Sequence, residues 1–190
     1  MEKTVVIGLT GMAGSGKSTA GRYLKEKYGF EFIVMSDLIR AEAERRGFLK
    51  HTDLEAQKAV ISKFGVLWRE ETGEDQIVAE KTIEMMKKGR LHKIAVDGFR
   101  SPGEVELFRK TFEGFKLIYV KADPDVRWKR RLEQDPKAKR NDFDSRDKRD
   151  SQMMGMREVL EMADMTVENS GSVTELHKNM DKAMHKLLST

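Results

Sequence analysis

The sequence predicts an α/β fold in which helices cover both faces of a five-stranded parallel sheet, as a three-layer sandwich. Short apolar runs alternate with segments of helical periodicity along the whole chain, and this alternation is typical of parallel sheets. The runs cover residues 4–10, 30–35, 93–97, 115–121 and 164–168. A length of 190 residues suits one domain, so we expect residues 1–190 to fold as a unit.

Helix starts are marked by local signals. The spacing Ser/Thr-x-x-Glu of a capping box occurs at residues 52–55, 101–104 and 172–175. Pro102 and Pro124 occupy first-turn positions, where a missing N–H costs nothing.

Three further segments are assigned from their pattern. Residues 37–46 are predicted to form a helix, and residues 52–89 a polar helical stretch broken at Gly65 and Gly73. Residues 134–145 have poor apolar periodicity and contain Pro136, which predicts a mobile loop.

Residues 11–18, Gly-Met-Ala-Gly-Ser-Gly-Lys-Ser, match the phosphate-binding pattern G-x-x-x-x-G-K-[ST] between a strand and a helix. Glycines let the backbone N–H groups wrap around phosphate oxygens at the positive end of a helix dipole. Lys17 supplies a compact charge to the outer phosphates, and the Ser18 hydroxyl is a ligand type for Mg²⁺. The alternative is a glycine-rich turn with a stray lysine. The predicted nucleotide-contacting residues are Gly11, Met12, Ala13, Gly14, Ser15, Gly16, Lys17, Ser18 and Thr19.

Polar side chains follow the other strands, and open α/β sheets bind ligands at the carboxyl ends of their strands. Asp97 directly follows the apolar run 94–96. This is the position expected for a carboxylate that binds magnesium together with Ser18. The alternative is that Asp97 caps the next turn. Arg40 and Arg100 are placed to hold an acceptor phosphate, since guanidinium forks match phosphate oxygens.

The donor side is expected to carry further groups. Arg127 and Arg131 share one helix face at i, i+4 spacing, and Arg127 and Asn169 are candidate nucleotide contacts. Lys17, Asp97, Arg131 and Arg146 are the candidate catalytic groups around the transferring phosphate. For Arg146 the alternative is an ordinary exposed arginine.

No residue stands out as a general base. Phosphoryl transfer tolerates this, because it relies on alignment and charge neutralisation. An acceptor phosphate needs no activated base, whereas for an acceptor hydroxyl Asp37 is the carboxylate expected to serve.

The net charge of +4 is concentrated in one segment. Residues 126–150 contain ten Lys/Arg and six Asp/Glu, so the rest of the chain sums to zero. A compact basic segment suggests a small lid over phosphates, placed at residues 132–147; the alternative is a solvated helix and loop. A nucleic-acid partner is not expected, since the basic residues form no broad stripe and no interleaved aromatic residues offer stacking.

The composition excludes two classes of protein. The chain has no cysteine, which rules out a disulfide scaffold and a thiolate metal site. No apolar run reaches membrane-spanning length and no signal peptide precedes the first strand, so we expect a cytoplasmic protein with no membrane partner.

With these motifs the chain resembles P-loop nucleoside-phosphate kinases over nearly its whole length. Residues 8–18 resemble the start of dephospho-CoA kinases, and Ala163-Asp164 with residues 168–172 resemble their last strand and helix. The middle is similar to adenylate kinases. Asp37-x-x-Arg40 looks like their monophosphate-site helix, and residues 97–100 are similar to their Asp-Gly-Phe-Pro-Arg turn but one residue shorter.

Two more segments carry the adenylate kinase resemblance: Arg127-x-x-x-Arg131 matches the donor-side arginine pair, and Arg140-x-Asp142 resembles the start of the lid motif. The combination is most similar to an archaeal group of adenylate-kinase-related, dephospho-CoA-kinase-like proteins, which share Met35-Ser36-Asp37, residues 97–101 and Arg146-Asp147. The resemblance implies strand order 2-3-1-4-5, ATP with Mg²⁺ and a small lid.

The sequence therefore favours a kinase that moves the γ-phosphate of ATP to a small phosphorylated, nucleotide-like acceptor. Residues 37–90 are expected to form its acceptor-binding helical insertion. An ATPase switch without an acceptor is the alternative, but Gly98 stands where such a protein places a glutamate beside the magnesium aspartate. The Asn-Lys-x-Asp motif of GTPases is absent.

Overall fold

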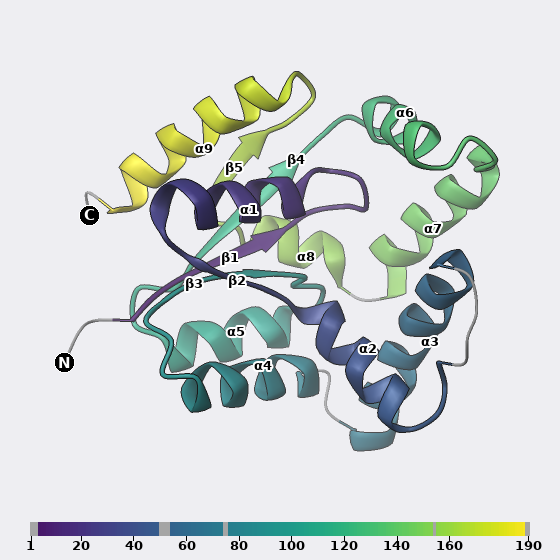
Figure 1. Cartoon of the computed structure of the whole chain (residues 1–190), viewed down its shortest axis with the longest axis horizontal. Helices are drawn as coiled ribbons and strands as arrows, with labels where there is room; N and C mark the ends of the chain where they lie inside the picture. Colours follow the sequence, from purple (N-terminus) through teal and green to yellow (C-terminus); the bar gives the residue numbers. More distant parts are fainter. Residues whose placement is uncertain (1–3, 50–53, 74–75, 154, 189–190) are drawn as a thin grey trace.

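A computed structural model of the protein describes residues 4–49, 54–73, 76–153 and 155–188. Five parallel strands form one sheet in the order β2-β3-β1-β4-β5, which confirms the predicted fold and strand order (Figure 1). The strands are β1 (Val5–Thr10), β2 (Glu31–Val34), β3 (Lys93–Asp97), β4 (Lys116–Lys121) and β5 (Met165–Glu168).

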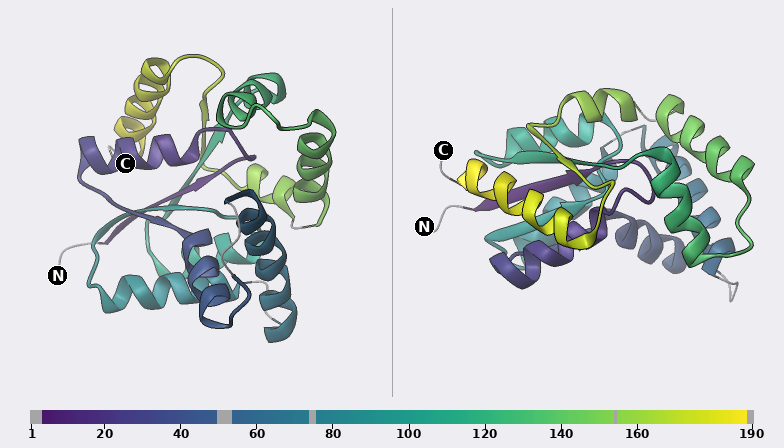
Figure 2. Two further views of the ribbon diagram at one scale, coloured as in Figure 1. Left: turned by 45° about the vertical axis from the view of Figure 1, so that its right-hand side comes forward. Right: turned by 90° about the horizontal axis from the view of Figure 1, so that it is seen from above.

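Helices cover both faces of this sheet, as Figures 1 and 2 show. One layer consists of α1 (Lys17–Tyr28) and α9 (Val173–Leu188), and the other of α4 (Ile77–Lys88), α5 (Pro102–Thr111) and α8 (Met156–Glu161). Successive residues of β1 point to opposite faces of the sheet. Val6 packs into the core beneath α4 and α5, and Ile7 packs into the core beneath α1 and α9. The central strands β1 and β3 carry continuous apolar runs because both of their faces are buried.

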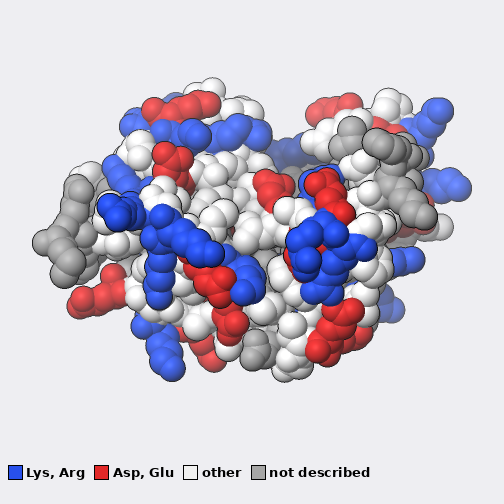
Figure 3. All heavy atoms as spheres, turned by 60° about the horizontal axis from the view of Figure 1, so that its bottom comes forward, with Lys and Arg blue, Asp and Glu red and all other residues white. Residues whose placement is uncertain are grey.

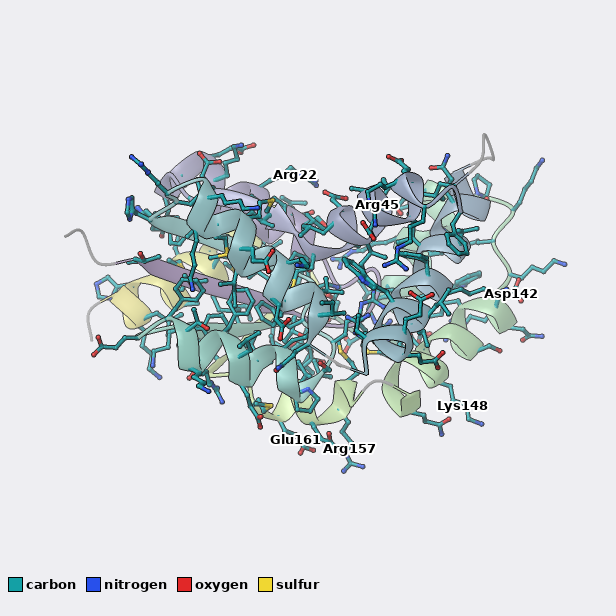
Figure 4. All side chains as sticks on the ribbon, turned by 90° about the horizontal axis from the view of Figure 1, so that it is seen from below. Arg22, Arg45, Asp142, Lys148, Arg157 and Glu161 are labelled. Atoms are coloured by element: carbon teal, nitrogen blue, oxygen red, sulfur yellow. The ribbon has the colours of Figure 1, made fainter. Side chains whose placement is uncertain are left out.

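Two helical pairs lie beyond the carboxyl ends of the strands (Figure 1). On one side are α2 (Met35–Arg45) and α3 (Leu54–Thr72), and on the other α6 (Pro124–Gln134) and α7 (Arg140–Met153). The side chains of Asp142 and Lys148 project outward from α7 (Figure 4). The sheet edge expected to bind ligands is therefore flanked by helices from two separate parts of the chain.

Two of the predicted capping boxes are present. At the start of α5, the Ser101 hydroxyl accepts a hydrogen bond from the Glu104 N–H at 3.3 Å, and the Glu104 carboxylate accepts one from the Ser101 N–H at 3.3 Å. Ser172 and Glu175 make the same exchange before α9. The third box begins at Thr52, outside the described residues.

The predicted break at Gly65 is wrong, because α3 runs through this residue. A Cβ at Gly65 would lie 3.2 Å from Ile39 Cδ1 and 3.4 Å from the Arg69 Nη1 atom. The glycine therefore serves close helix packing. The predicted break at Gly73 is confirmed, since this residue follows the last residue of α3 with φ +67°.

The loop predicted at residues 134–145 is shorter, because α7 begins at Arg140. The first turns of α7 are held by charge and ring contacts that apolar periodicity does not register. Arg140 pairs with Asp144 and with Asp125 of α6, both at 3.0 Å, and the Phe143 ring packs against Trp128 at 5.6 Å between centroids.

The apolarity of the helices and the distribution of surface charge bear on the predictions about membrane and nucleic-acid partners. None of the helices in the described ranges has the length and apolarity needed to cross a bilayer. On the face shown in Figure 3, Lys and Arg side chains are interspersed with Asp and Glu rather than gathered into a continuous basic stripe.

Candidate active site

The phosphate-binding loop connects β1 to α1 and has an unusual backbone. Gly11, Gly14 and Gly16 adopt φ values of +144°, +78° and +98°, a region that side chains disfavour. A Cβ at Gly11 would lie 2.4 Å from the Val120 carbonyl oxygen of β4. The dihedral angle thus favours glycine at all three positions, and lack of space also requires it at Gly11.

Lys17 is the first residue of α1, and its ammonium folds back over the loop. Its Nζ donates to the carbonyl oxygens of Gly11 at 2.7 Å and Met12 at 3.2 Å. The first N–H groups of a helix have no intrahelical partner and carry the positive end of its dipole. Lys17 and the start of α1 thus surround the loop with positive charge. Ser18 and Thr19 follow in the first turn of this helix.

Asn169 supports the loop from behind. It follows β5, is 4 % exposed, and its side-chain amide donates to the Ser15 carbonyl oxygen at 2.7 Å. A Cβ at Gly16 would lie 2.1 Å from the Asn169 Nδ2 atom. Arg130 of α6 then donates to the Asn169 carbonyl oxygen at 2.8 Å. The last strand of the sheet therefore fixes the loop made by the first.

Asp97 lies at the end of β3, beside the start of α1. Its Oδ2 accepts a hydrogen bond from the Ser18 hydroxyl at 3.3 Å, while its buried Oδ1 has no hydrogen-bond partner among the described residues. Burial raises the pKa of the Asp97 carboxyl, against the lowering effects of Lys17, the Ser18 hydroxyl and Arg100. An unpartnered buried carboxylate oxygen next to a serine hydroxyl is a donor set that fits Mg²⁺.

The turn from β3 to α5 faces the loop. Gly98 has φ +118°, and its N–H donates to the Leu9 carbonyl oxygen at 3.2 Å. Thr10 Oγ1 donates to the Phe99 carbonyl oxygen at 3.1 Å. A small recess lies between the two segments, lined by residues 11–13, Lys17, residues 98–100, Asp150 and Met156.

The predicted acceptor residues lie on the β2 and β3 side of this recess. Arg100 lines it, and the guanidinium of Arg100 has no hydrogen bond or ion pair with other described residues. Asp37 is exposed in the first turn of α2, and its charge raises the pKa of Asp97. Arg40 is turned toward α3, where its Nη1 donates to Gln57 Oε1 at 2.7 Å.

The two arginines predicted to lie on the donor side make different contacts. Arg127 is buried against the loop, and its guanidinium donates to the Ala13 carbonyl oxygen at 3.1 Å and pairs with Asp147 of α7. Arg131 instead pairs with Asp135 at the end of its own helix, at 3.1 Å. The side chain of Arg146 lies outside the described part of the protein.

Comparison with known proteins identifies the family of this chain. A family model described as an AAA domain matches residues 10–149. A UPF0200 protein of the archaeon Methanothermobacter thermautotrophicus is 35% identical over 186 residues, covering 96% of this chain and 90% of its own. The chain belongs to the UPF0200 family.

Two solved structures share the fold of this UPF0200 chain. Shikimate kinase from Acinetobacter baumannii matches with a TM-score of 0.59 and 18% identity, covering 99% of this chain and 95% of its own. A dephospho-CoA kinase from Campylobacter jejuni matches with a TM-score of 0.53 and 16% identity, covering 98% of each chain. The expected P-loop kinase fold is confirmed.

Sequence reasoning missed several groups at this site. Asp150 and Met156 line the recess, and Asp147 and Arg130 hold Arg127 and the loop. Arg130 and Asp150 are marked only by their place in the basic segment, Met156 lies just after it, and Asp147 is marked only as part of the Arg146-Asp147 pair of the family resemblance. None of these signals shows which side of a helix faces the loop. In UPF0200 sequences, an acidic residue at each of positions 147 and 150 is the pattern to look for.

Proposed function

We propose that this chain is an ATP- and Mg²⁺-dependent kinase that transfers a γ-phosphate to a small nucleotide-like acceptor of the nucleoside monophosphate or dephospho-CoA type. The observation that carries the proposal is the recess in which Lys17 and the phosphate loop face Arg100. A cation opposite the loop supports binding of a second phosphate-bearing molecule.

The donor would occupy the phosphate loop. Lys17 exchanges its two backbone carbonyl contacts for phosphate oxygens, and the loop N–H groups bind the remaining oxygens. Ser18 and Asp97 would hold Mg²⁺, which neutralises charge on the phosphates when bound. Arg127 lies close enough to the loop, through the Ala13 carbonyl, to bind the donor side.

The acceptor would lie between the β3–α5 turn and α2. Within the described ranges, the Arg100 guanidinium has no hydrogen-bond or ion-pair partner and Arg40 bonds to the neutral amide of Gln57, so the positive charge of each arginine is available to an acceptor phosphate. For a phosphate acceptor no base is needed. For a hydroxyl acceptor, Asp37 is exposed on the same edge and would take the proton.

The transfer itself forms one bond and breaks one. An acceptor oxygen attacks the γ-phosphorus as the bond to the β–γ bridging oxygen breaks, and ADP leaves with that oxygen. Lys17 and Arg100 lie on either side of the recess, where negative charge on the transferring group would be neutralised.

An acceptor screen tests the proposal. ATP consumption by the wild-type protein is measured with Mg²⁺ alone and with AMP, CMP, dUMP or dephospho-CoA added. We expect consumption to depend on one of these acceptors, and we expect Lys17→Ala to reduce it by at least about 100-fold with the fold intact.

Lys25→Ala is the matched control, because Lys25 lies in the same helix but is exposed and forms a weak surface ion pair with Glu31, at 3.9 Å. It should keep wild-type turnover. Equal ATP consumption with and without every acceptor would favour an ATPase switch instead, and normal turnover by Lys17→Ala would refute the site.

A further inference from the structure

A buried ion pair connects α3 to the turn that carries Arg100. Arg69 of α3 donates from Nη2 to Glu104 Oε1 of α5 at 2.6 Å, and their side chains are 9% and 0% exposed. The Arg69 Nη1 atom donates to the Gly65 carbonyl oxygen at 2.8 Å, which fixes the plane of the guanidinium. Gly65 gives this guanidinium its space.

The second oxygen of Glu104 faces the turn. Glu104 Oε2 accepts hydrogen bonds from the backbone N–H of Arg100 at 2.8 Å and of Ser101 at 3.3 Å. One carboxylate thus joins the guanidinium of α3 to the backbone from which the Arg100 side chain leaves. A capping box alone needs no such arginine, since Ser172 and Glu175 form theirs at the surface.

The same helix also holds the other acceptor-side arginine, through the hydrogen bond between Arg40 and Gln57. Gln57 and Arg69 are 12 residues apart in α3, so they lie roughly 18 Å apart along the helix axis at 1.5 Å per residue. The contact of Arg40 with α3 is therefore separate from the ion pair of Arg69, and removal of Arg69 leaves it in place.

We propose that Arg69 and Glu104 are positioning residues for the acceptor: through their ion pair, α3 sets the backbone of Arg100 and so aims its guanidinium into the recess. This inference rests on the proposed kinase function. Under this proposal the affinity for the acceptor depends on α3, although no residue of α3 lines the recess. The affinity for ATP does not depend on α3.

The first test is kinetic. Arg69→Met should raise the acceptor KM by about tenfold or more, because small misplacements of binding groups are costly, and should leave ATP affinity within about twofold. Arg109→Met is the matched control on α5. It removes an ion pair with Asp164 at the far end of the helix, and should change neither constant.

A double-mutant cycle separates positioning from stability. If Arg69 acts through Arg100, then Arg69→Met adds no further increase in acceptor KM to that of Arg100→Ala. If the two substitutions instead raise the acceptor KM by independent factors that multiply in the double variant, the inference is wrong. The variant Arg69→Met with Glu104→Gln leaves no unpaired buried charge, so its melting temperature should recover while its acceptor KM stays high. Recovery of both would show a purely structural pair.

Amide hydrogen exchange tests the link without any turnover. In Arg69→Met the Arg100 N–H should exchange about tenfold faster, whereas the Gly98 N–H, held by the Leu9 carbonyl, should change little. Unchanged exchange at Arg100 would refute the link. A wild-type protein that phosphorylates no acceptor would count against the proposed function alone, and the exchange result would still decide the link.

Discussion

Gly16 shows at the scale of one residue how the phosphate-binding loop excludes side chains. Its φ of +98° disfavours any Cβ, and the space a Cβ would take is filled by the Asn169 amide. Backbone strain and steric conflict therefore act together at a position that ends the loop and begins α1.

Gly16→Ala should lower ATP affinity by at least about tenfold, because the left-handed conformation costs an L-residue about 1–2 kcal/mol and Asn169 must also move. Calorimetric titration with ATP measures the loss. Gly29→Ala is the control: Gly29 also has positive φ, +68°, but nothing lies within 4 Å of its Cβ position. That variant should lose stability only, and equal loss of ATP affinity in both would contradict the assigned loop geometry.

At this scale the sequence predicts residue types better than side-chain directions. The fixed positions of the octet determine the loop, because glycine and lysine are needed there for local reasons. The paths of Arg127 and Arg131 were not predictable. They share a helix face, yet Arg127 bonds to the loop and to Asp147 of α7, whereas Arg131 pairs with Asp135 four residues further on. Which of the two reaches the loop is decided by how α6 packs against the loop and α7.

At the scale of elements, one carboxylate joins α1 to α9. Asp181 of α9 accepts hydrogen bonds from the hydroxyls of Tyr23 and Tyr28 at 2.7 and 2.8 Å and from Lys27 at 2.7 Å. The Tyr23 ring also stacks on His177 at 3.9 Å between centroids. Bonds from Lys27, Tyr23 and Tyr28 lower the pKa of Asp181 to about 2.

This depressed pKa makes stability depend on acid pH. The stabilisation is fully present above the unfolded-state pKa of about 4 and is lost as pH falls toward 2, because the carboxyl group then gains a proton. Asp181→Asn should therefore show a smaller drop in melting temperature between neutral pH and about pH 2.5 than the wild type does. Glu26→Gln, on the exposed side of α1, should keep the wild-type drop; the same drop in all three proteins would contradict the role of Asp181.

Elements marked by apolar runs or by short-range spacing were predictable, and those that depend on contacts with other elements were not. The strands and the capping boxes at Ser101 and Ser172 follow from apolar runs and short-range spacing. The start of α7 at Arg140 is held by ion pairs with residues of both α6 and α7, and Gly65 lies within α3 at a point where α2 packs too close for a larger side chain. Such contacts are known only once the elements are assembled.

At the scale of the whole molecule, the sheet brings four strand ends to one edge. The loop after β1, Asp97 after β3, Arg127 after β4 and Asn169 after β5 all lie around the start of α1. The alternation of strands and helices predicted a parallel sheet, and the family resemblance supplied the strand order. The acceptor remains a proposal, because residues 47–89 carry no motif that names a ligand.

The central claim is that this edge binds the polyphosphate of ATP together with Mg²⁺ at Ser18 and Asp97. Titration calorimetry with a non-hydrolysable ATP analogue, with and without Mg²⁺, tests it most directly. The account predicts that Mg²⁺ tightens binding to the wild type by at least about tenfold and that Asp97→Asn abolishes this gain while metal-free binding persists. Binding that is equally tight with and without Mg²⁺, or an unchanged magnesium gain in Asp97→Asn, would contradict it.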